Sequence, residues 1–398
     1  MPLIRKGGPV SYTIKNRDQH FQNDGGPKRI LALDGGGLRG ILTLRIVAKI
    51  ENALKERHGG DDSFRLCHYF DLVAGTSTGS IIAAAVALGM KADDISKMYL
   101  DLGEKVFQKS FFRQGVFRAL YDQADLITEL KKVFGANTTL GSDDLKTGLL
   151  VVTKRLDSGS PWPIGNNPRG KYYGPREGSE AIPNRDYPLW QVVRASTAAP
   201  RYFEPEEIEI LSAPGKKPVA GRFVDGGVSP SNNPALQALM YATLDGYRVG
   251  WPMGADKILL VSIGTGLRSP AVNPTSITAS EAISALLSLM DDCGALVETL
   301  LQWMSTSPSP RTIDRELADL RHDVLGGTPL LTYLRYNIEL ERDSLKGELG
   351  LDLSAEDVEP LSAMDDPANM RMLAKIGDLV GEKKVFERDF PTAFDLVI

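Results

Sequence analysis

Cysteine and histidine are scarce in this 398-residue sequence, which contains two cysteines and four histidines. Cys67 and Cys293 cannot form a disulfide framework, and neither has neighbours at metal-ligand spacing, so we expect two buried thiols and no metal site. The chain also lacks a basic excess, since it has 46 basic and 51 acidic side chains and a net charge of −5. Without a long basic block, a dedicated nucleic-acid-binding protein is not expected.

Long apolar runs are missing as well. The longest strongly apolar stretch, Ile81–Met90, is about half of the ~20 residues that span a bilayer, so no transmembrane helix is expected. The charged residues 1–8 are not followed by the apolar segment of a signal peptide, which favours a cytoplasmic protein. The composition, 42% hydrophobic and 24% charged, excludes a disordered or fibrous chain.

What is present begins with two strand–turn–helix units. The apolar run Arg29–Leu33 leads through three glycines into a helical pattern over Leu38–His58. The run Phe70–Ala74 leads through a second glycine-containing turn into a small-residue helix over Ser80–Gly89. Such alternation predicts an α/β fold, with a mainly parallel sheet sandwiched by helices.

The rest of the chain continues this alternation. Periodicity predicts further helices over Asp93–Phe107, Gln123–Phe134 and Ser280–Met304, and buried strands over Gly148–Thr153 and Lys257–Ile263. The Pro-, Gly- and Asn-rich segment Ser158–Asn184 is interpreted as a loop. Neither a repeat nor a low-complexity tract occurs, and the sequence does not indicate an oligomeric state.

The first motif with chemical meaning is Gly75-Thr76-Ser77-Thr78-Gly79, a G-x-S-x-G pattern between an apolar run and a helix. This is the context of a nucleophile elbow, in which a sharp turn exposes the serine above the sheet edge. The flanking glycines avoid clashes with neighbouring backbone. The motif predicts Ser77 as a nucleophile, although a strand-to-helix turn without chemistry remains an equal alternative from the pattern alone.

The second motif, Asp34–Gly40, follows the first strand directly and contains three consecutive glycines. The backbone N–H groups of Gly35, Gly36 and Gly37 can turn outward together to form an oxyanion hole, and Arg39 can support that anion site or fasten the loop. The same loop matches a dinucleotide-binding fingerprint. That alternative lacks the acidic residue expected at the end of a second strand.

A serine hydrolase also needs a base. None of the four histidines, His20, His58, His68 and His322, lies in a glycine-rich or otherwise site-like context. Asp225 instead ends a short apolar run and is followed by two glycines, so its carboxylate can be presented to a site with little cover. Asp225 is therefore the candidate base, although Asp-Gly-Gly is also a common turn sequence.

Together these residues resemble the patatin-like phospholipases, lipid acyl hydrolases that use a Ser-Asp dyad. Four motifs occur in the family's order: the Asp34–Gly40 loop, the Gly75–Gly79 elbow, the Ala195–Pro200 block and Asp225-Gly226-Gly227. The resemblance implies Ser77 as nucleophile and Asp225 as base. It implies an oxyanion hole formed by Gly35, Gly36, Gly37 and Arg39.

The resemblance also sets the expected domains and activity. It implies a polar tail over 1–27, a patatin-like catalytic domain with a variant α/β-hydrolase architecture over 28–340, and a C-terminal extension over 341–398 packed on or beside it. The implied activity is that of a serine esterase, a phospholipase A-type enzyme that forms an acyl-serine intermediate and requires neither metal nor organic cofactor. Its substrates would be membrane glycerophospholipids, in lipid metabolism.

An enzyme of this kind must act peripherally at a phospholipid membrane surface, and two segments are candidates for that contact. One is the aromatic and cationic stretch 111–117, and the other is the Ser280–Met304 helix, whose leucines are more often core residues. Two other functions remain open. One is a non-catalytic or regulatory protein that binds a nucleotide at Gly35–Gly40, and the other is a ligand-activated lipase effector in bacterial defence.

Overall fold

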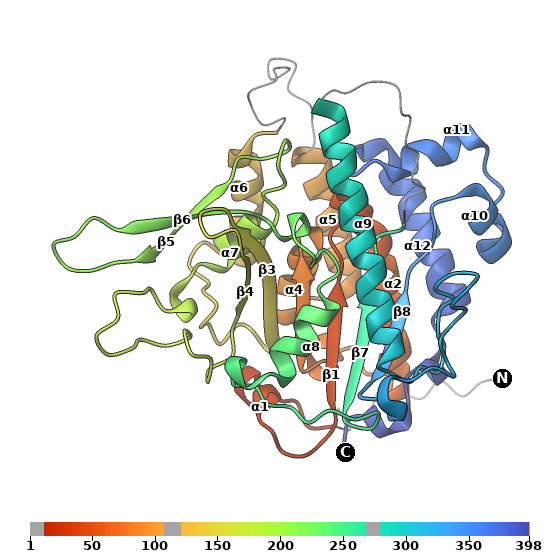
Figure 1. Ribbon diagram of the computed structural model, residues 1–398, viewed down its shortest axis with the longest axis horizontal. Coiled ribbons are helices and arrows are strands. Elements are labelled where there is room, and N and C mark those ends of the chain that lie inside the picture. Colours follow the sequence, from red (N-terminus) through yellow and green to blue (C-terminus); the bar gives the residue numbers. More distant parts are fainter. Residues whose placement is uncertain (1–11, 107–120, 268–278, 398) are drawn as a thin grey trace.

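A mixed eight-stranded sheet forms the centre of the computed structural model, which describes residues 12–106, 121–267 and 279–397 (Figure 1). The strand order is β5-β6-β3-β2-β1-β7-β8, and β4 pairs with β3 beside this path. The strands are β1 (Lys28–Leu33), β2 (Leu72–Thr76), β3 (Gly148–Arg155), β4 (Pro161–Gly165), β5 (Glu206–Leu211), β6 (Val219–Asp225), β7 (Ile258–Ile263) and β8 (Thr332–Tyr336).

The middle of the sheet is parallel, as the sequence predicts. Strands β3, β2, β1, β7 and β8 run in one direction, and every residue of β1, β2 and β7 is buried. Continuous apolar strands of this kind require helices on both faces. Strands β4, β5 and β6 pair antiparallel at one edge, and the β5–β6 hairpin extends away from the body of the molecule (Figure 1).

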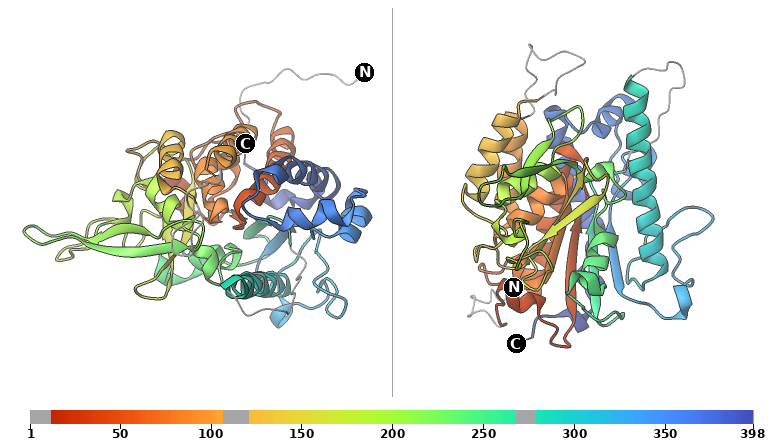
Figure 2. Two further views of the ribbon diagram at one scale, coloured as in Figure 1. Left: turned by 90° about the horizontal axis from the view of Figure 1, so that it is seen from above. Right: turned by 60° about the vertical axis from the view of Figure 1, so that its left-hand side comes forward.

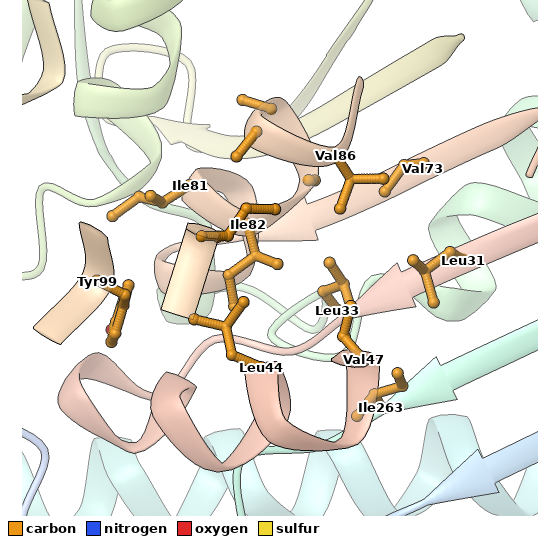
Figure 3. Close-up of a cluster of buried hydrophobic side chains, with 14 of the residues drawn as sticks. Leu31, Leu33, Leu44, Val47, Val73, Ile81, Ile82, Val86, Tyr99 and Ile263 are labelled. Atoms are coloured by element: carbon orange, nitrogen blue, oxygen red, sulfur yellow. The ribbon is translucent and has the colours of Figure 1, made fainter. Parts of the chain in front are cut away.

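Helices cover both faces of the sheet (Figure 2). The main helices are α2 (Gly40–Arg57), α4 (Thr78–Ala87), α5 (Ala92–Val106), α6 (Gln123–Phe134), α7 (Leu189–Ser196), α8 (Ala235–Thr243), α9 (Ala279–Trp303) and α12 (Met370–Lys384). On one face, a single apolar cluster joins two helices to the strands (Figure 3). It contains Leu44 and Val47 of α2 and Ile82 and Val86 of α4. Helices α8 and α9 contribute to a second cluster on the opposite face, with Leu239 and Leu301.

Helix α12, near the C-terminus, packs closely on an earlier part of the chain. Helix α12 lies along α2, and a Cβ atom added at Gly377 would come within 2.6 Å of the Leu42 carbonyl oxygen. A glycine at this position therefore lets the two helices approach closely. The shorter helices α3 (Leu66–Tyr69), α10 (Arg342–Leu349) and α11 (Ala355–Val358) complete the helical layers.

Two segments are more structured than the sequence predicts. The polar tail contains α1 (Arg17–Phe21), whose Phe21 is buried and whose His20 contacts the buried Asp71. The Pro-rich loop contains β4, which pairs antiparallel with β3 at the edge of the sheet, a position where prolines are tolerated. The aromatic stretch 111–117 lies outside the described residues. Within the described part, no helix is long and apolar enough to cross a membrane.

Candidate active site

Ser77 lies between the last residue of β2 and the first residue of α4. Its φ of 53° and ψ of −129° place a non-glycine residue in a strained backbone conformation. Close backbone contacts require glycine on both sides of Ser77. A Cβ added at Gly75 would lie 2.1 Å from the Gly79 carbonyl oxygen, and a Cβ added at Gly79 would lie 2.1 Å from the Leu33 carbonyl oxygen. The G-x-S-x-G motif therefore has the strand–turn–helix geometry of a nucleophile elbow.

The strained turn is held by Ser196, a residue whose role the sequence did not reveal. The Ser77 N–H donates to Ser196 Oγ at 2.9 Å, and the Ser196 hydroxyl donates to the Val152 carbonyl at 2.6 Å. Ser196 is buried at the end of α7. It thus fastens the elbow to β3, and the only sequence signal for it was the Ala195–Pro200 block.

Asp225 ends β6 and lies close to Ser77 because β3 connects their strands. Thr76 pairs with Val152 on β3, and the next β3 residue, Thr153, pairs with Asp225. The carboxylate is buried and accepts a hydrogen bond from the Gly227 N–H at 2.7 Å, and the neighbouring Ser77 hydroxyl stabilises its charged form. The structure therefore brings the two predicted dyad residues together across about 150 residues of sequence.

Burial changes the acidity of this carboxyl group. Removal from water raises the pKa of Asp225 to about 6, although the Ser77 hydroxyl, the Gly227 N–H and the nearby Arg194 cation each oppose that rise. A carboxylate with a pKa near neutrality is a better proton acceptor than an ordinary aspartate and is still ionised at pH 7. The pair can therefore perform general-base-assisted nucleophilic attack.

The glycine loop lies directly beside this pair. The Gly35 N–H is already bonded to the Asn232 carbonyl at 3.1 Å, which differs from its predicted role as an oxyanion donor. Within the described residues, the N–H groups of Gly36 and Gly37 have no partner. Both glycines border the same cavity as Ser77. Two of the three predicted donors are thus free to stabilise an oxyanion.

Arg39 fastens the loop from behind. Its guanidinium is buried and donates to the carbonyl oxygens of Gly36, at 3.4 Å, and Gly266, at 3.2 Å. Of the two roles predicted for Arg39, support of the anion or attachment of the loop, these contacts favour attachment. Its positive charge still lies close behind the two free donors.

A buried ion network that the sequence did not reveal supports the start of the loop. Arg335 on β8 donates to both carboxylate oxygens of Asp34, at 3.0 and 2.6 Å, and to Glu298 on α9 at 3.3 Å. A bidentate arginine–carboxylate pair fixes geometry as well as charge. Because the three residues lie far apart in the sequence, no local pattern could have indicated this contact.

A cavity of about 320 Å³ opens beside Ser77 and Asp225. Its walls are mainly apolar and come from α4, α5, the segment after α7, α9 and the C-terminal region. The larger side chains are Ile81, Tyr99, Leu102, Leu126, Tyr202, Phe203, Leu286, Leu287, Met290 and Met364. Tyr202 and Phe203 closely follow the Ala195–Pro200 block. The shape and chemistry suit a fatty acyl chain.

None of the four histidines lies at this cavity. His20 contacts Asp71 at 2.8 Å, His58 accepts from the Leu396 N–H at 3.1 Å, and His322 is exposed. His68 contacts the Tyr12 hydroxyl, and burial lowers the pKa of His68 to about 4. Among the described residues, no group of three or more His, Cys, Asp or Glu side chains could hold a metal ion.

Single His→Ala replacements are therefore expected to retain turnover. The variants of His58, His68 and His322 should keep kcat within about threefold, because a histidine outside the site contributes nothing to proton transfer. His20→Ala removes a partner of the buried Asp71, so His20→Gln is the fairer variant. Hydrolysis of a soluble ester and circular dichroism are measured together. A histidine variant that is folded but inactive would contradict the Ser-Asp dyad and favour a catalytic triad that includes that histidine.

Gly37 provides a test of the oxyanion loop. Its φ is +58°, and an added Cβ would lie 2.3 Å from the Met364 carbonyl oxygen, which accepts the Leu38 N–H at 2.7 Å. Gly37→Ala should displace the loop and lower kcat by about 10²-fold or more. Gly159→Ala is the matched control, because Gly159 has a φ of +69° and no atom within 4 Å of the added Cβ. Equal kcat in both variants would contradict the loop's role.

Comparison with known proteins agrees with this geometry. Residues 31–239, more than half of the chain, match the family model described as patatin-like phospholipase. The chain belongs to the patatin-like phospholipase family. The predicted family and the predicted α/β fold are thus confirmed.

Patatin-like relatives come from bacteria, animals and plants. An Escherichia coli cGAMP-activated phospholipase is 27% identical over 63% of this chain and 65% of its own length, and one from Vibrio cholerae is 27% identical over 65% and 69%. A Caenorhabditis elegans intracellular phospholipase A2 is 27% identical over 73% of this chain but only 24% of its own length. The chain therefore spans less than two thirds of the length of the Escherichia coli and Caenorhabditis elegans relatives. A match to the structure of human GIVD cytosolic phospholipase A2 covers 90% of this chain and 59% of the human chain, with a TM-score of 0.41 and 12% sequence identity.

The C-terminal region contributes to the patatin-like site although it lies beyond the family match. Met364 accepts the Leu38 N–H through its carbonyl and lines the cavity with its neighbour Asp365. The Asp365 carboxylate in turn accepts from the Tyr121 hydroxyl at 2.8 Å. The predicted extension 341–398 therefore borders the candidate active site as well as packing on α2. The sequence carried no signal for this contact.

Proposed function

We propose that this protein is a lipid acyl hydrolase of the phospholipase A type. The observation that carries the proposal is the contact of Ser77, in a strained elbow, with the buried Asp225 at an apolar cavity. A strained nucleophile, a base of raised pKa and free backbone donors together match the requirements of ester hydrolysis. Membership of the patatin-like phospholipase family supports the same chemistry.

In the proposed mechanism, Asp225 accepts the Ser77 proton while Ser77 Oγ attacks the ester carbonyl carbon. The N–H groups of Gly36 and Gly37 stabilise the negative oxygen of the tetrahedral intermediate. Collapse of that intermediate breaks the ester bond, and the proton passes from Asp225 to the departing alcohol. Water then attacks the acyl-Ser77 ester with Asp225 again as base, and a free fatty acid leaves.

The proposed substrates are membrane glycerophospholipids. The apolar walls of the cavity suit an acyl chain. The relatives from bacteria and animals are named as phospholipases, which supports phospholipids as the substrate class. Incubation with vesicles of mixed phospholipids, followed by mass spectrometry of the products, tests this. We expect free fatty acids and lysophospholipids. Release of phosphorylated headgroups or of no product would overturn the proposal.

Helix α9 is the proposed contact with the lipid surface. Its Leu286, Leu287 and Met290 line the cavity, while Leu289 and Leu296 are each 58% exposed on the same helix. Large exposed leucines on a helix that also lines the acyl cavity suit an interfacial helix. The leucines of this helix therefore differ in burial: Leu301 lies in the core, whereas Leu289 and Leu296 are exposed.

Replacement of the two exposed leucines tests this contact. Leu289→Ser with Leu296→Ser should lower hydrolysis of phospholipid vesicles about tenfold and leave hydrolysis of a soluble short-chain ester unchanged, because the cavity itself is intact. Val219→Ser on the β5–β6 hairpin is the control, since Val219 is 48% exposed and this hairpin extends away from the body of the molecule that carries α9 (Figure 1). Equal losses on both substrates would contradict an interfacial role.

A regulated hydrolase is the second candidate, because two relatives are named cGAMP-activated phospholipases. The Gly35–Gly40 loop is a poor place for such a ligand. Added Cβ atoms at Gly36 and Gly37 would lie 2.2 Å from Thr265 and 2.3 Å from Met364, so the loop is closely packed on that side, and both glycines border the acyl cavity. A regulatory ligand would need another site.

A further inference from the structure

A second cavity lies in the part of the molecule formed by β4, the loop that follows it, and the end of α8. Its volume is about 510 Å³, within the range of small-molecule sites, and it shares no lining residue with the acyl cavity. Five of the chain's twelve tyrosines line it, together with one tryptophan. The six aromatic residues are Trp162, Tyr172, Tyr173, Tyr187, Tyr241 and Tyr247.

Several polar groups that line the cavity have no hydrogen-bond partner in the described part of the chain. Tyr173 and Tyr187 are only 9% and 4% exposed, yet within the described residues neither hydroxyl has a hydrogen-bond partner, and neither oxygen is fully enclosed. The side chain of Asn184 also lines the cavity without a partner in the described part of the chain. Buried hydroxyls of this kind normally find a partner, so unpartnered hydroxyls on residues that line a cavity point to a ligand.

The charge of the lining selects the class of ligand. Its only ionisable groups of fixed charge are the cations Arg155 and Lys171, and no carboxylate lines the cavity. Arg155 is paired with Asp157, but Lys171 has no ion pair among the described residues and lies over the Tyr172 ring at 5.4 Å. Aromatic faces bind planar rings, and a cation without a competing carboxylate binds an anion. A carbohydrate would not need that charge.

We propose that this cavity, lined by Trp162, Lys171 and Tyr187, binds a nucleotide, with the base against the aromatic side chains and a phosphate at Lys171. The site has a physical connection to the catalytic strand. Trp162 pairs with Thr153 on β3, and its ring stacks on Phe223 at 4.8 Å, two residues before Asp225. In this proposal, a ligand in the cavity shifts Trp162 and, through Phe223, the strand that ends in Asp225. This second step, a change in hydrolysis rate, rests on the proposed acyl hydrolase function.

Binding is tested by calorimetry on the full chain with cyclic GMP–AMP, GMP, guanosine and maltose as probes. We expect cyclic GMP–AMP or GMP to bind, and guanosine, which lacks a phosphate, to bind at least tenfold more weakly. Lys171→Met and Tyr187→Phe should each weaken binding about tenfold, while Lys217→Met, an exposed lysine of the β5–β6 hairpin, should not. Absence of binding, equal binding of guanosine, binding of maltose alone, or unchanged binding in both cavity variants would each overturn the proposal.

The same titration on Ser77→Ala separates the two proposals. Binding should be unchanged in that variant, because the two cavities share no residue. If neither phospholipid nor soluble ester is hydrolysed under any condition, the acyl hydrolase function fails while the binding result stands. If hydrolysis occurs and a bound nucleotide changes its rate less than twofold, the coupling through Trp162 and Phe223 is overturned.

Discussion

Ser77→Ala is expected to abolish acyl hydrolysis, with kcat lowered by at least about 10⁴-fold, because the variant lacks the hydroxyl that forms the acyl-enzyme in the proposed mechanism. The fold should remain, since alanine accepts the strained φ of 53° about as well as serine does. The Ser77 backbone N–H also keeps its bond to Ser196. We therefore expect the melting temperature to change by no more than about 2 °C.

A fluorophosphonate probe measures the same residue directly. The probe should label Ser77 in the wild-type protein, as mapped by peptide mass spectrometry, and should not label Ser77→Ala. Ser158→Ala, a change at an exposed serine, should label normally. Labelling of a different serine, or hydrolysis by Ser77→Ala at the wild-type rate, would move the nucleophile elsewhere.

Asp225→Asn is expected to lower kcat by about 10³-fold or more, because an amide of the same size cannot accept the Ser77 proton. In the wild-type protein kcat/KM should fall as the pH drops through about 6, where Asp225 becomes protonated. The hydrogen bond from the Gly227 N–H can be kept by the amide oxygen. Loss of activity without loss of structure would identify Asp225 as the base.

The same variant is expected to be more stable than the wild type above pH 6. Burial raises the pKa of Asp225 from 3.8 to about 6, so between those values the folded protein binds more protons than the unfolded chain. The free energy of unfolding therefore falls with rising pH across this interval, by on the order of 2–3 kcal/mol. Asparagine carries no charge and avoids that loss. The gain should be present at pH 8 and absent below about pH 4.

Thermal unfolding at pH 4 and pH 8 tests the sign. We expect Asp225→Asn to melt roughly 2–5 °C above the wild type at pH 8 and at nearly the same temperature at pH 4. Asp101→Asn, an exposed change on α5, is the control and should show no such pH-dependent difference. A variant that is destabilised at both pH values would show that the carboxylate contributes to folding rather than opposing it.

The local parts of the site could be predicted from the sequence. The elbow around Ser77 and the loop at Gly35–Gly37 depend on glycines whose contacts are short, so their residue pattern specifies their conformation. The parallel centre of the sheet was predictable because its strands are apolar on both faces. These features depend on steric limits and hydrophobic periodicity, which act over a few residues.

The tertiary structure decided which of these parts meet. Strand pairing across β3 brings Asp225 to Ser77, Ser196 holds the elbow, and Arg335 anchors Asp34. The structure also assigned the Gly35 N–H to Asn232 and brought Met364 to the loop from a region beyond the family match. Hydrogen bonds and ion pairs between distant segments depend on strand order and helix packing, which no local pattern encodes. The sequence by itself therefore determined the candidate reacting groups, and the packing of the sheet and its helices determined how they contact one another.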